Sequence, residues 1–509
     1  MLRPTFPEFL KLAKRGTHVP VYRELPFDTE TPITAYAKLA RAHSDSSGTR
    51  FGFLLESLVG GEKWARWTFL GAAPRAAWKL DRGGRVSTWS SSGGWSPASA
   101  TADPLADLDA RLRAVRPVAV AGLPRFFGGA VGFVGYDTIR YIERLPSAPR
   151  DDLGLPDALF LFTDVVLAID NVYGRAQAIA TVETGDEPDE SELRRRWDDA
   201  RRRIDDLVRL LATEPPPPPL RNEPAHADPP FRSATTREAY ETGVRKIREY
   251  ILAGDAFQVV LSQRLEVPLA AEPFALYRAL RSVNPSPYLY FLELDDFALV
   301  GSSPEVLARV EDGRVTVRPI AGTRPRGSTD EEDAALAKDL LADAKERAEH
   351  LMLVDLGRND VGRVAHFGSV RVPSFMEIER YSHVLHIVSQ VEGVLRDGLS
   401  ALDVLRACFP AGTVSGAPKI RAMQIIDELE PVRRGTYAGA VGYIAYGGRA
   451  MDTAIAIRTI LARGDCAYVQ AGAGIVADSV PATEYEETLA KARALLRVLA
   501  MVSDDGTVR

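Results

Sequence analysis

A proline-rich stretch is the strongest constraint on how this chain of 509 residues can fold. Residues 213–230 read TEPPPPPLRNEPAHADPP and include five consecutive prolines. Proline cannot donate the backbone hydrogen bond that a helix interior or a central strand requires. We therefore expect an extended linker over residues 213–232 between an N-terminal domain (1–212) and a C-terminal domain (233–500), followed by a tail (501–509).

The hydrophobic patterns differ on the two sides of this linker. Residues 30–180 contain short apolar runs broken by Gly and Pro, such as FGFLLES and DVVLAIDNVYGRAQAIATV, which predict strands joined by turns. Residues 236–500 alternate long helical patterns with strand-like runs. On its own, this pattern predicts only a mixed α and β protein.

A charged helix is predicted immediately before the linker, in ESELRRRWDDARRRIDDLVRLLA. Its apolar residues fall on one helical face, namely Leu193, Trp197, Ile204, Leu207 and Leu211. The arginine triplets are compatible with a phosphate or nucleic-acid patch. Because interleaved aspartates nearly cancel their charge, a solvated helix face is the better interpretation.

The overall charge and the cysteines exclude several classes of protein. Lys and Arg number 63 and Asp and Glu number 69, for a net charge of −6, which gives no field that would attract nucleic acid or an anionic membrane. Two cysteines are too few for a disulfide framework. We find no signal-peptide pattern and no apolar run long enough to span a membrane. These features predict a globular protein of the cytoplasm.

Two pairs of glutamates carry the first chemical signal. Glu346 and Glu349 are three residues apart in the helical segment DEEDAALAKDLLADAKERAEHLMLVDL, and Glu484 and Glu487 are three apart in a second helix, with Lys491 one turn later. Two such pairs could converge on one Mg²⁺ ion, which prefers oxygen ligands. Each pair alone is more typical of a solvated helix face.

Three glycine-rich segments carry the second signal. They read PIAGTRPRG (319–327), FPAGTVSGAPK (409–419) and VQAGAGIVADSVP (469–481), and none has the spacing of a nucleotide-binding loop. Glycine lets backbone N–H groups approach an anion, and Arg458 lies on a strand-like segment between the second and third of them. A carboxylate ligand is the better interpretation, with ordinary tight turns and a surface arginine as the alternative.

Two single residues are candidates for proton transfer. His386 lies in the apolar run YSHVLHIVSQ, where a histidine is more often a satisfied core residue than a catalytic one. Glu305 follows a turn and begins a strand in GSSPEVLARV, a suitable place for a buried acid. Neither assignment stands without further context.

That context comes from a resemblance to the chorismate-utilising enzymes, and among them to the large subunits of anthranilate synthase. In order along the chain, the matching motifs are FLLES, WTFLG, FGGAVGFVGYD, PIAGTRPRG, EHLMLVDLGRND, RYSHVLHIVSQVEG, FPAGTVSGAPKIRAM, RRGTYAGAVGY, DTAIAIRT and QAGAGIVADSVPATEYEET. The resemblance implies an α+β fold of two interlocked domains, with large, mostly antiparallel sheets in an orthogonal sandwich and helices outside. It also makes 1–212 the tryptophan-binding domain and 233–500 the chorismate-binding catalytic domain.

Three positions distinguish the reactions of this family. Enzymes that add water to chorismate have a lysine where this chain has Gln258, and the para-aminobenzoate branch has a lysine where it has Ala321. The family associates the third position, His386, with release of pyruvate. The resemblance therefore implies an enzyme of tryptophan biosynthesis that converts chorismate and ammonia to anthranilate and pyruvate.

The resemblance also assigns the site residues. It implies Mg²⁺ held by Glu349 and Glu487, with Glu346 and Glu484 as neighbours, and Glu305 and His386 as catalytic residues. The implied chorismate-binding residues are Gly322, Thr323, Thr413, Tyr437, Arg458, Gly472, Ala473, Gly474 and Lys491. The implied site for tryptophan as feedback inhibitor comprises Ser57, Pro287, Tyr288 and Tyr443.

The source of ammonia is expected to be another protein. A glutamine amidotransferase needs a nucleophilic cysteine in a glycine-rich turn, and neither Cys408 nor Cys466 has that setting. We therefore expect a glutamine amidotransferase small subunit and a hetero-oligomer. Two alternatives stay open: an aminodeoxyisochorismate synthase that keeps the pyruvyl group, and a non-catalytic sensor of chorismate or tryptophan.

Overall fold

The computed structural model describes residues 1–42, 50–58, 66–163, 165–185, 189–220, 229–381 and 384–502. The centre of the expected linker (221–228) and most of the expected tail (503–509) lie outside these ranges. No helix in the described ranges is long and apolar enough to cross a membrane.

The first of two large sheets runs through the whole chain, and its named strands pair antiparallel. In spatial order its strands are β1 (Leu2–Arg3), β2 (His18–Pro26), β12 (Arg175–Glu183), β11 (Val165–Asp170), β4 (Trp67–Ala72), β3 (Phe51–Glu56), β15 (Tyr288–Leu294), β16 (Phe297–Ser303), β25 (Thr459–Arg463), β26 (Cys466–Ile475), β14 (Gln258–Pro268) and β13 (Arg232–Ser233), and β22 (Gly416–Ala417) pairs with β14.

The named strands of the second sheet also pair antiparallel. In spatial order its strands are β19 (Ile320–Pro325), β21 (Val384–Val394), β18 (Arg314–Val317), β17 (Val306–Glu311), β24 (Met451–Ile455), β23 (Ala440–Ala445), β9 (Gly129–Val134), β10 (Ala158–Phe162), β5 (Ala76–Asp81), β6 (Arg85–Ser90) and β7 (Gly94–Trp95), while β20 (Arg371–Arg380) pairs with β21 and β8 (Ser99–Ala100) with β6.

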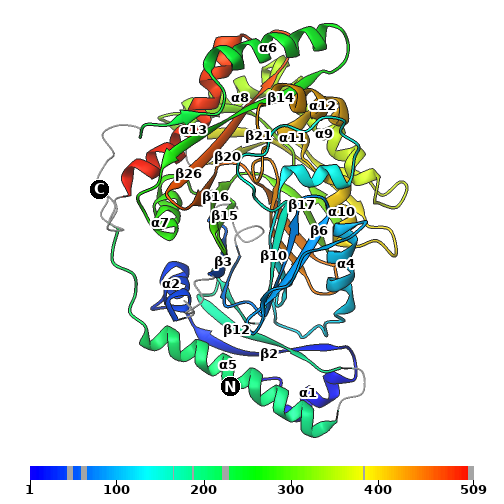
Figure 1. Cartoon of the computed structure of the whole chain (residues 1–509), viewed down its shortest axis with the longest axis vertical. Coiled ribbons are helices and arrows are strands. Elements are labelled where there is room, and N and C mark those ends of the chain that lie inside the picture. Colours follow the sequence, from blue (N-terminus) through cyan, green and yellow to red (C-terminus); the bar gives the residue numbers. More distant parts are fainter. Residues whose placement is uncertain are drawn as a thin grey trace.

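Helices cover the outer faces of both sheets (Figure 1). They are α1 (Phe6–Ala13), α2 (Pro32–Ala42), α4 (Pro104–Ala114), the 3₁₀ helix η1 (Tyr136–Tyr141), α5 (Glu190–Thr213), α6 (Arg237–Leu252), α7 (Pro273–Val283), α8 (Asp330–Ala342), α9 (Ala344–Gly362), α10 (Ala401–Cys408), α11 (Gly412–Ser415), α12 (Lys419–Leu429) and α13 (Pro481–Met501). The prediction of an α+β fold with antiparallel sheets and outer helices is confirmed.

Both sheets contain strands from each side of the proline-rich stretch. In the first sheet the N-terminal strand β3 pairs with β15, with Leu54 opposite Phe291. In the second sheet β9 pairs with β23, with Gly132 opposite Gly442. The two parts are therefore interlocked. The domain boundaries at residues 213–232 stay a prediction.

The contact between β9 and β23 joins two similar segments of sequence, GGAVGFVGY and AGAVGYIAY. A Cβ atom on Gly132 would lie 2.0 Å from the carbonyl oxygen of Leu159, and one on Gly442 would lie 2.1 Å from that of Asp452. Only glycine fits such an approach of neighbouring backbones. The shared glycine pattern is thus a packing requirement of this junction.

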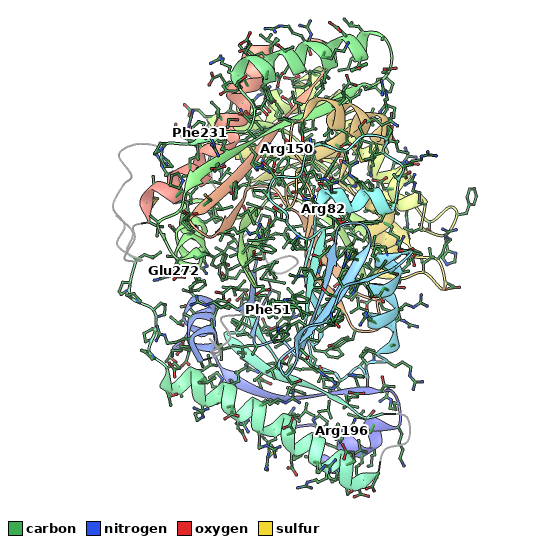
Figure 2. The ribbon with its side chains drawn as sticks, viewed as in Figure 1. Phe51, Arg82, Arg150, Arg196, Phe231 and Glu272 are labelled. Atoms are coloured by element: carbon green, nitrogen blue, oxygen red, sulfur yellow. The ribbon has the colours of Figure 1, made fainter. Side chains whose placement is uncertain are left out.

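An apolar core fills the space between the sheets. It contains aromatic residues from both parts of the chain, including Phe53, Phe133 and Phe297, each no more than 4% exposed. Phe51, which belongs to the same core, lies in the interior in Figure 2, whereas Arg196 lies on α5 at the edge of the molecule. Because this core takes side chains from both sheets, the sheets pack face to face.

The charged helix predicted before the linker forms as α5, and the predicted acidic helix forms as two consecutive helices. The apolar face of α5 is buried, including Leu193 and Trp197. The acidic segment that reads as continuously helical divides into α8 and α9 at Asp343, whose carboxylate accepts hydrogen bonds from the N–H groups of Lys345 and Glu346 at 3.0 and 3.2 Å. Asp343 thus caps the start of α9 and places Glu346 in its first turn.

A buried ion pair ties together three elements beside the glycine-rich segments. Arg434 and Glu430 are 3% and 5% exposed, and they contact each other at 2.7 and 2.9 Å. The guanidinium also donates to the carbonyl oxygens of Val414 and Val260, and Glu430 accepts from the backbone N–H of Ser262 at 2.9 Å. This pair therefore holds β14, α11 and the segment before β23 in one arrangement.

We predict that Glu430→Gln lowers the free energy of unfolding by about 3–5 kcal/mol, because it leaves the buried Arg434 charge without its partner. The matched control is Asp355→Asn, which removes an exposed i, i+3 contact with Arg358 at 2.7 Å and should cost less than about 1 kcal/mol. Urea unfolding followed by circular dichroism measures both. A loss for Glu430→Gln no larger than the control's would contradict the role of this pair.

Candidate functional site

Glycines of β26 allow side chains to meet over this strand. A Cβ atom on Gly474 would lie 2.2 Å from Nε2 of Gln258, and one on Gly472 would lie 2.9 Å from the hydroxyl of Tyr437. The segment predicted as a glycine loop is therefore mostly a strand, and its glycines make room for neighbouring side chains. PIAGT is likewise part of β19, with a bulge between Ala321 and Thr323.

Arg458 lies in a turn between β24 and β25, where a strand-like position was predicted. Its φ is +51°, a left-handed conformation that the turn fixes by a hydrogen bond from the N–H of Ser302 to the Arg458 carbonyl oxygen at 3.0 Å. Within the ranges that the structure describes, its guanidinium makes no hydrogen bond or ion pair with another side chain. Burial lowers its pKa, and the nearby Tyr437 and Glu487 partly offset this effect.

A guanidinium that is partly withdrawn from water and has no ion-pair partner is costly unless an anion binds to it. The surroundings of Arg458 are suited to a carboxylate, because Tyr437 offers a hydroxyl and Lys491 an ammonium group nearby. Lys491 donates to the carbonyl oxygen of Gly472 at 3.0 Å and contacts Glu487 at 2.6 Å. Burial raises the pKa of Tyr437 to about 12, so its hydroxyl remains a hydrogen-bond donor at neutral pH.

His386 lies on β21 and faces β19. Its Nδ1 is 2.9 Å from the carbonyl oxygen of Gly322 and 3.2 Å from Oγ1 of Thr323. A carbonyl oxygen can only accept, so Nδ1 carries the proton and Nε2 keeps its lone pair. Burial, and then the charge of Arg458, lower the pKa of His386, and the imidazole is neutral at pH 7.

Glu305 lies between β16 and β17 and is 4% exposed. Its Oε1 accepts a hydrogen bond from Oγ1 of Thr413 at 2.8 Å. Burial raises the pKa of Glu305 to about 8, although Thr413 and the N–H of Ile320 favour the ionised form. The carboxyl is therefore mostly protonated at pH 7 and can donate a proton.

The two glutamate pairs lie on α9 and α13. Burial and the charge of Glu349 raise the pKa of Glu346, and burial and then Glu487 raise that of Glu484. A Cβ atom on Gly322 would lie 3.1 Å from Oε2 of Glu346, and Gln258 donates to Oε1 of Glu349 at 3.2 Å. These contacts bring the pair on α9 to the same glycine segments as His386 and Gln258.

The two helices also contact each other through a charged pair. Lys345, at the start of α9, contacts Asp478, just before α13, at 3.3 Å. The charge of Lys345 also reaches Glu484, where it offsets part of the rise in pKa that burial causes. The first turns of the two helices are therefore neighbours.

The acidic side chains of α9 and α13 are candidates for a metal site. Within the described residues, no group of three or more His, Cys, Asp or Glu side chains is arranged to hold a metal ion. Mg²⁺ does not require such a group, because one or two carboxylates with water and substrate oxygens usually suffice. In each pair one carboxyl, Glu346 or Glu484, has a pKa raised first by burial and then by the charge of its partner, and such a site suits a divalent cation, so Mg²⁺ remains compatible with the donors.

A separate pocket of about 620 Å³ contains all four residues of the implied tryptophan site. Ser57 follows β3, Pro287 and Tyr288 lie at the start of β15, and Tyr443 lies on β23. The pocket thus lies where the two parts of the chain join. Its aromatic wall includes Phe69, whose ring centroid is 5.6 Å from that of Tyr443.

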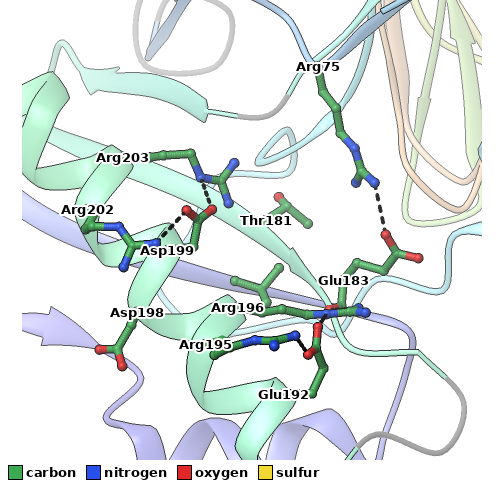
Figure 3. A pocket seen from close by; sticks show the side chains of 11 residues that line it. Arg75, Thr181, Glu183, Glu192, Arg195, Arg196, Asp198, Asp199, Arg202 and Arg203 are labelled. Atoms are coloured by element: carbon green, nitrogen blue, oxygen red, sulfur yellow. Dashed lines mark hydrogen bonds and ion pairs between the residues drawn. The ribbon is translucent and has the colours of Figure 1, made fainter. Parts of the chain in front are cut away.

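A cavity of about 760 Å³ lies elsewhere, between α5 and the end of β12 (Figure 3). Its arginines face acidic side chains: Arg196 contacts Glu192 at 2.8 Å, and Arg75 contacts Glu183 at 3.0 Å. Arg202 pairs with Asp199 at 3.0 Å. The interpretation of α5 as a charge-balanced, solvated face is consistent with these pairs, and we assign no ligand to the cavity.

Comparison with known proteins identifies the family. Residues 62–497 match the model of the chorismate binding enzymes. The chain belongs to the chorismate-binding enzyme family. It is 51% identical to anthranilate synthase component 1 of Pseudomonas aeruginosa over 97% of this chain and 98% of that protein, and 50% identical to that of Thermus thermophilus over 93% and 96%.

Solved structures agree with this membership. The crystal structure of anthranilate synthase component I from Streptococcus pneumoniae is similar to this chorismate-binding enzyme with a TM-score of 0.75 and 38% identity, over 93% of this chain and 99% of that one. The menaquinone-specific isochorismate synthase of Escherichia coli has a TM-score of 0.67 at 19% identity, over 97% and 98%. The latter shows the shared fold alone.

The structure of this chorismate-binding enzyme adds residues that the sequence did not single out. Tyr381 lies against His386 with ring centroids 5.5 Å apart, and the charge of Glu305 is one of the smaller causes that raise the pKa of Tyr381, after burial. Its neighbour Glu379 pairs with Arg318. Only the position of Tyr381 within the RYSHVLH motif hinted at a role.

Proposed function

We propose that this enzyme converts chorismate and ammonia to anthranilate, pyruvate and water in tryptophan biosynthesis. The observation that carries the proposal is Arg458, a half-buried cation without a side-chain ion pair in the described ranges, in a chain about half identical to anthranilate synthases. Chorismate carries two carboxylates, and one of them supplies the missing anion.

Arg458, Tyr437 and Lys491 bind the pyruvyl carboxylate together with the backbone of residues 472–474. Guanidinium and ammonium groups provide charge-assisted hydrogen bonds to this group. Gly322, Thr323 and Thr413 line the ring. The contact of Tyr437 with Gly472, and of Lys491 with the carbonyl oxygen of Gly472, supports this grouping.

Glu305 acts as the general acid of the first step. Ammonia forms a bond to the ring carbon next to the ring carboxylate, the double bonds shift, and the ring hydroxyl leaves as water with the proton of Glu305. The pKa of about 8 keeps this acid protonated at neutral pH, and Thr413 fixes its orientation.

His386 acts in the second step. The aminated ring loses the proton from the carbon that carries nitrogen, the bond between the ring and the pyruvyl oxygen breaks, and the ring becomes aromatic. The neutral imidazole, with its Nδ1 proton directed to Gly322, offers the Nε2 lone pair as base. Aromatisation makes this elimination favourable.

Glu349 and Glu487 hold Mg²⁺, and Glu346 and Glu484 are their neighbours. When bound, Mg²⁺ neutralises the ring carboxylate and stabilises electron density that develops on the ring. The hydrogen bond from Gln258 orients Glu349. A glutamine at position 258 also leaves the site without a lysine base for water, which favours ammonia as the nucleophile.

Ammonia is supplied by a glutamine amidotransferase subunit, in a cytoplasmic hetero-oligomer. A nucleophilic cysteine needs a lowered pKa. Burial instead raises the pKa of Cys408, which is 2% exposed, and burial and Asp465 raise that of Cys466. Both cysteines are free thiols. These environments support a separate glutaminase.

The test of this function is product analysis with the purified chain. Chorismate, ammonium and Mg²⁺ should yield anthranilate and pyruvate in equal amounts, and glutamine should not replace ammonium because the chain lacks a glutaminase. Glu349→Gln should remove Mg²⁺-dependent turnover. An aminated ring that keeps its pyruvyl group as sole product indicates an aminodeoxyisochorismate synthase, and no product indicates a sensor.

A second prediction concerns pH. At a fixed concentration of free ammonia, kcat/KM should fall as the pH rises through about 8, because Glu305 loses the proton that it must donate. Glu305→Gln should lower kcat by about 10²–10⁴-fold and abolish this decline. The control is Glu293→Gln, which removes a half-buried carboxyl on β15 whose pKa is also raised by burial. A flat wild-type profile would exclude Glu305 as the acid.

Tryptophan binds as feedback inhibitor in the pocket of about 620 Å³. The aromatic rings of Phe69 and Tyr443 suit an indole, and Ser57 offers a hydroxyl. Because Ser57 follows β3 and Tyr443 lies on β23, a ligand here contacts strands of both sheets. This arrangement supports control of the enzyme through the junction of its two parts.

We predict that Ser57→Ala weakens tryptophan binding about tenfold, the effect of losing one hydrogen bond to a charged or polar ligand group. The matched control is Ser87→Ala, which removes another buried serine hydroxyl, on β6 and outside the pocket. Calorimetric titration with tryptophan gives the dissociation constants. Equal affinity of Ser57→Ala and wild type would exclude this residue from the site.

A further inference from the structure

Tyr381 is fixed at its hydroxyl end by a charged cluster. The hydroxyl donates to Oε2 of Glu379 at 2.8 Å, and Glu379 is paired with the guanidinium of Arg318. Burial and the adjacent Glu379 raise the pKa of Tyr381, so the hydroxyl stays protonated over the pH range in which proteins work. The tyrosine therefore has one defined anchor, on the strand that pairs with β21.

At its other end, the Tyr381 ring packs against the His386 imidazole. The ring centroids are 5.5 Å apart and the planes meet at 65°, an edge-to-face arrangement. Among the residues that the structure describes, His386 is held at Nδ1, by Gly322 and Thr323. A single anchored nitrogen lets an imidazole pivot about that contact, and the Tyr381 ring restricts this rotation.

Open space lies beside this tyrosine. A cavity of about 320 Å³ is lined by Tyr381 together with Tyr288, Arg318, Ile320 and Glu379. Without the hydrogen bond to Glu379, the ring could turn into this cavity and away from His386. The hydrogen bond to Glu379 thus keeps the Tyr381 ring against the His386 imidazole.

We propose that Tyr381, anchored by Glu379, is a positioning residue that sets the orientation of the His386 imidazole and so determines how much of the aminated intermediate goes on to release pyruvate. This inference rests on the proposed function for its effect on products. It makes no claim on the first step, in which Glu305, oriented by Thr413, donates the proton. Loss of Tyr381 should therefore separate the two steps.

The experiment compares Tyr381→Phe, which removes only the hydroxyl, with Tyr381→Leu, which removes the ring. With chorismate, ammonium and Mg²⁺, we expect both variants to consume chorismate while the ratio of anthranilate to aminated intermediate falls about tenfold or more, as expected for loss of an aromatic contact and its anchor. The matched control is Tyr250→Phe, which removes an exposed tyrosine–glutamate bond of 2.9 Å to Glu428.

A second readout does not depend on turnover. With only seven histidines in the chain, NMR titration of labelled histidine, assigned with His386→Ala, follows the His386 pKa. Tyr381→Leu should raise this pKa toward its ordinary value, because the imidazole becomes solvated. If Tyr381→Leu does not fold, Tyr381→Phe decides.

The outcomes separate the two proposals. A wild-type chain that does not act on chorismate overturns the proposed function, and the NMR titration then still decides the positioning role. An unchanged product ratio, or an unchanged His386 pKa in a folded Tyr381→Leu variant, overturns the positioning role alone. Equal effects in Tyr250→Phe would also overturn it.

Discussion

Strand pairing between the two parts of the chain is the constraint on which the rest of the structure depends. The pairs β3–β15 and β9–β23 place N-terminal strands in the middle of both sheets, so neither part can bury its sheet faces without the other. Glycines at the second junction permit an approach that any side chain would block. The pocket that contains Ser57 and Tyr443 lies at these junctions, where strands from both parts meet.

Burial, more than ion pairing, sets the charge states at the candidate site. Desolvation keeps Glu305 protonated and His386 neutral at pH 7, which gives an acid and a base within one group of side chains. Arg458 stays charged although burial lowers its pKa, because an arginine does not lose its proton near neutral pH. The site therefore favours binding of an anionic ligand whose charged group reaches the Arg458 guanidinium.

The sequence predicted the elements well where spacing alone decides. The i, i+3 spacing placed Glu346 with Glu349 and Glu484 with Glu487, and the periodicity of α5 identified its buried face. Arg458 shows the limit, since its left-handed turn depends on a hydrogen bond from Ser302, more than 150 residues earlier in the chain. The anchor of Tyr381 depends likewise on Arg318, on a different segment, and no local pattern reports it.

The proline-rich stretch shows a second limit of sequence reading. Its composition indicates a linker between two domains. A linker in the sequence does not separate the sheets, however, because strand order depends on pairing between distant segments. The cavity beside Tyr381 is an example, because its lining residues come from segments that are distant in the sequence. Tyr288 lines this cavity as well as the larger pocket with Ser57, so the two spaces share one wall, which is built by residues far apart in the sequence.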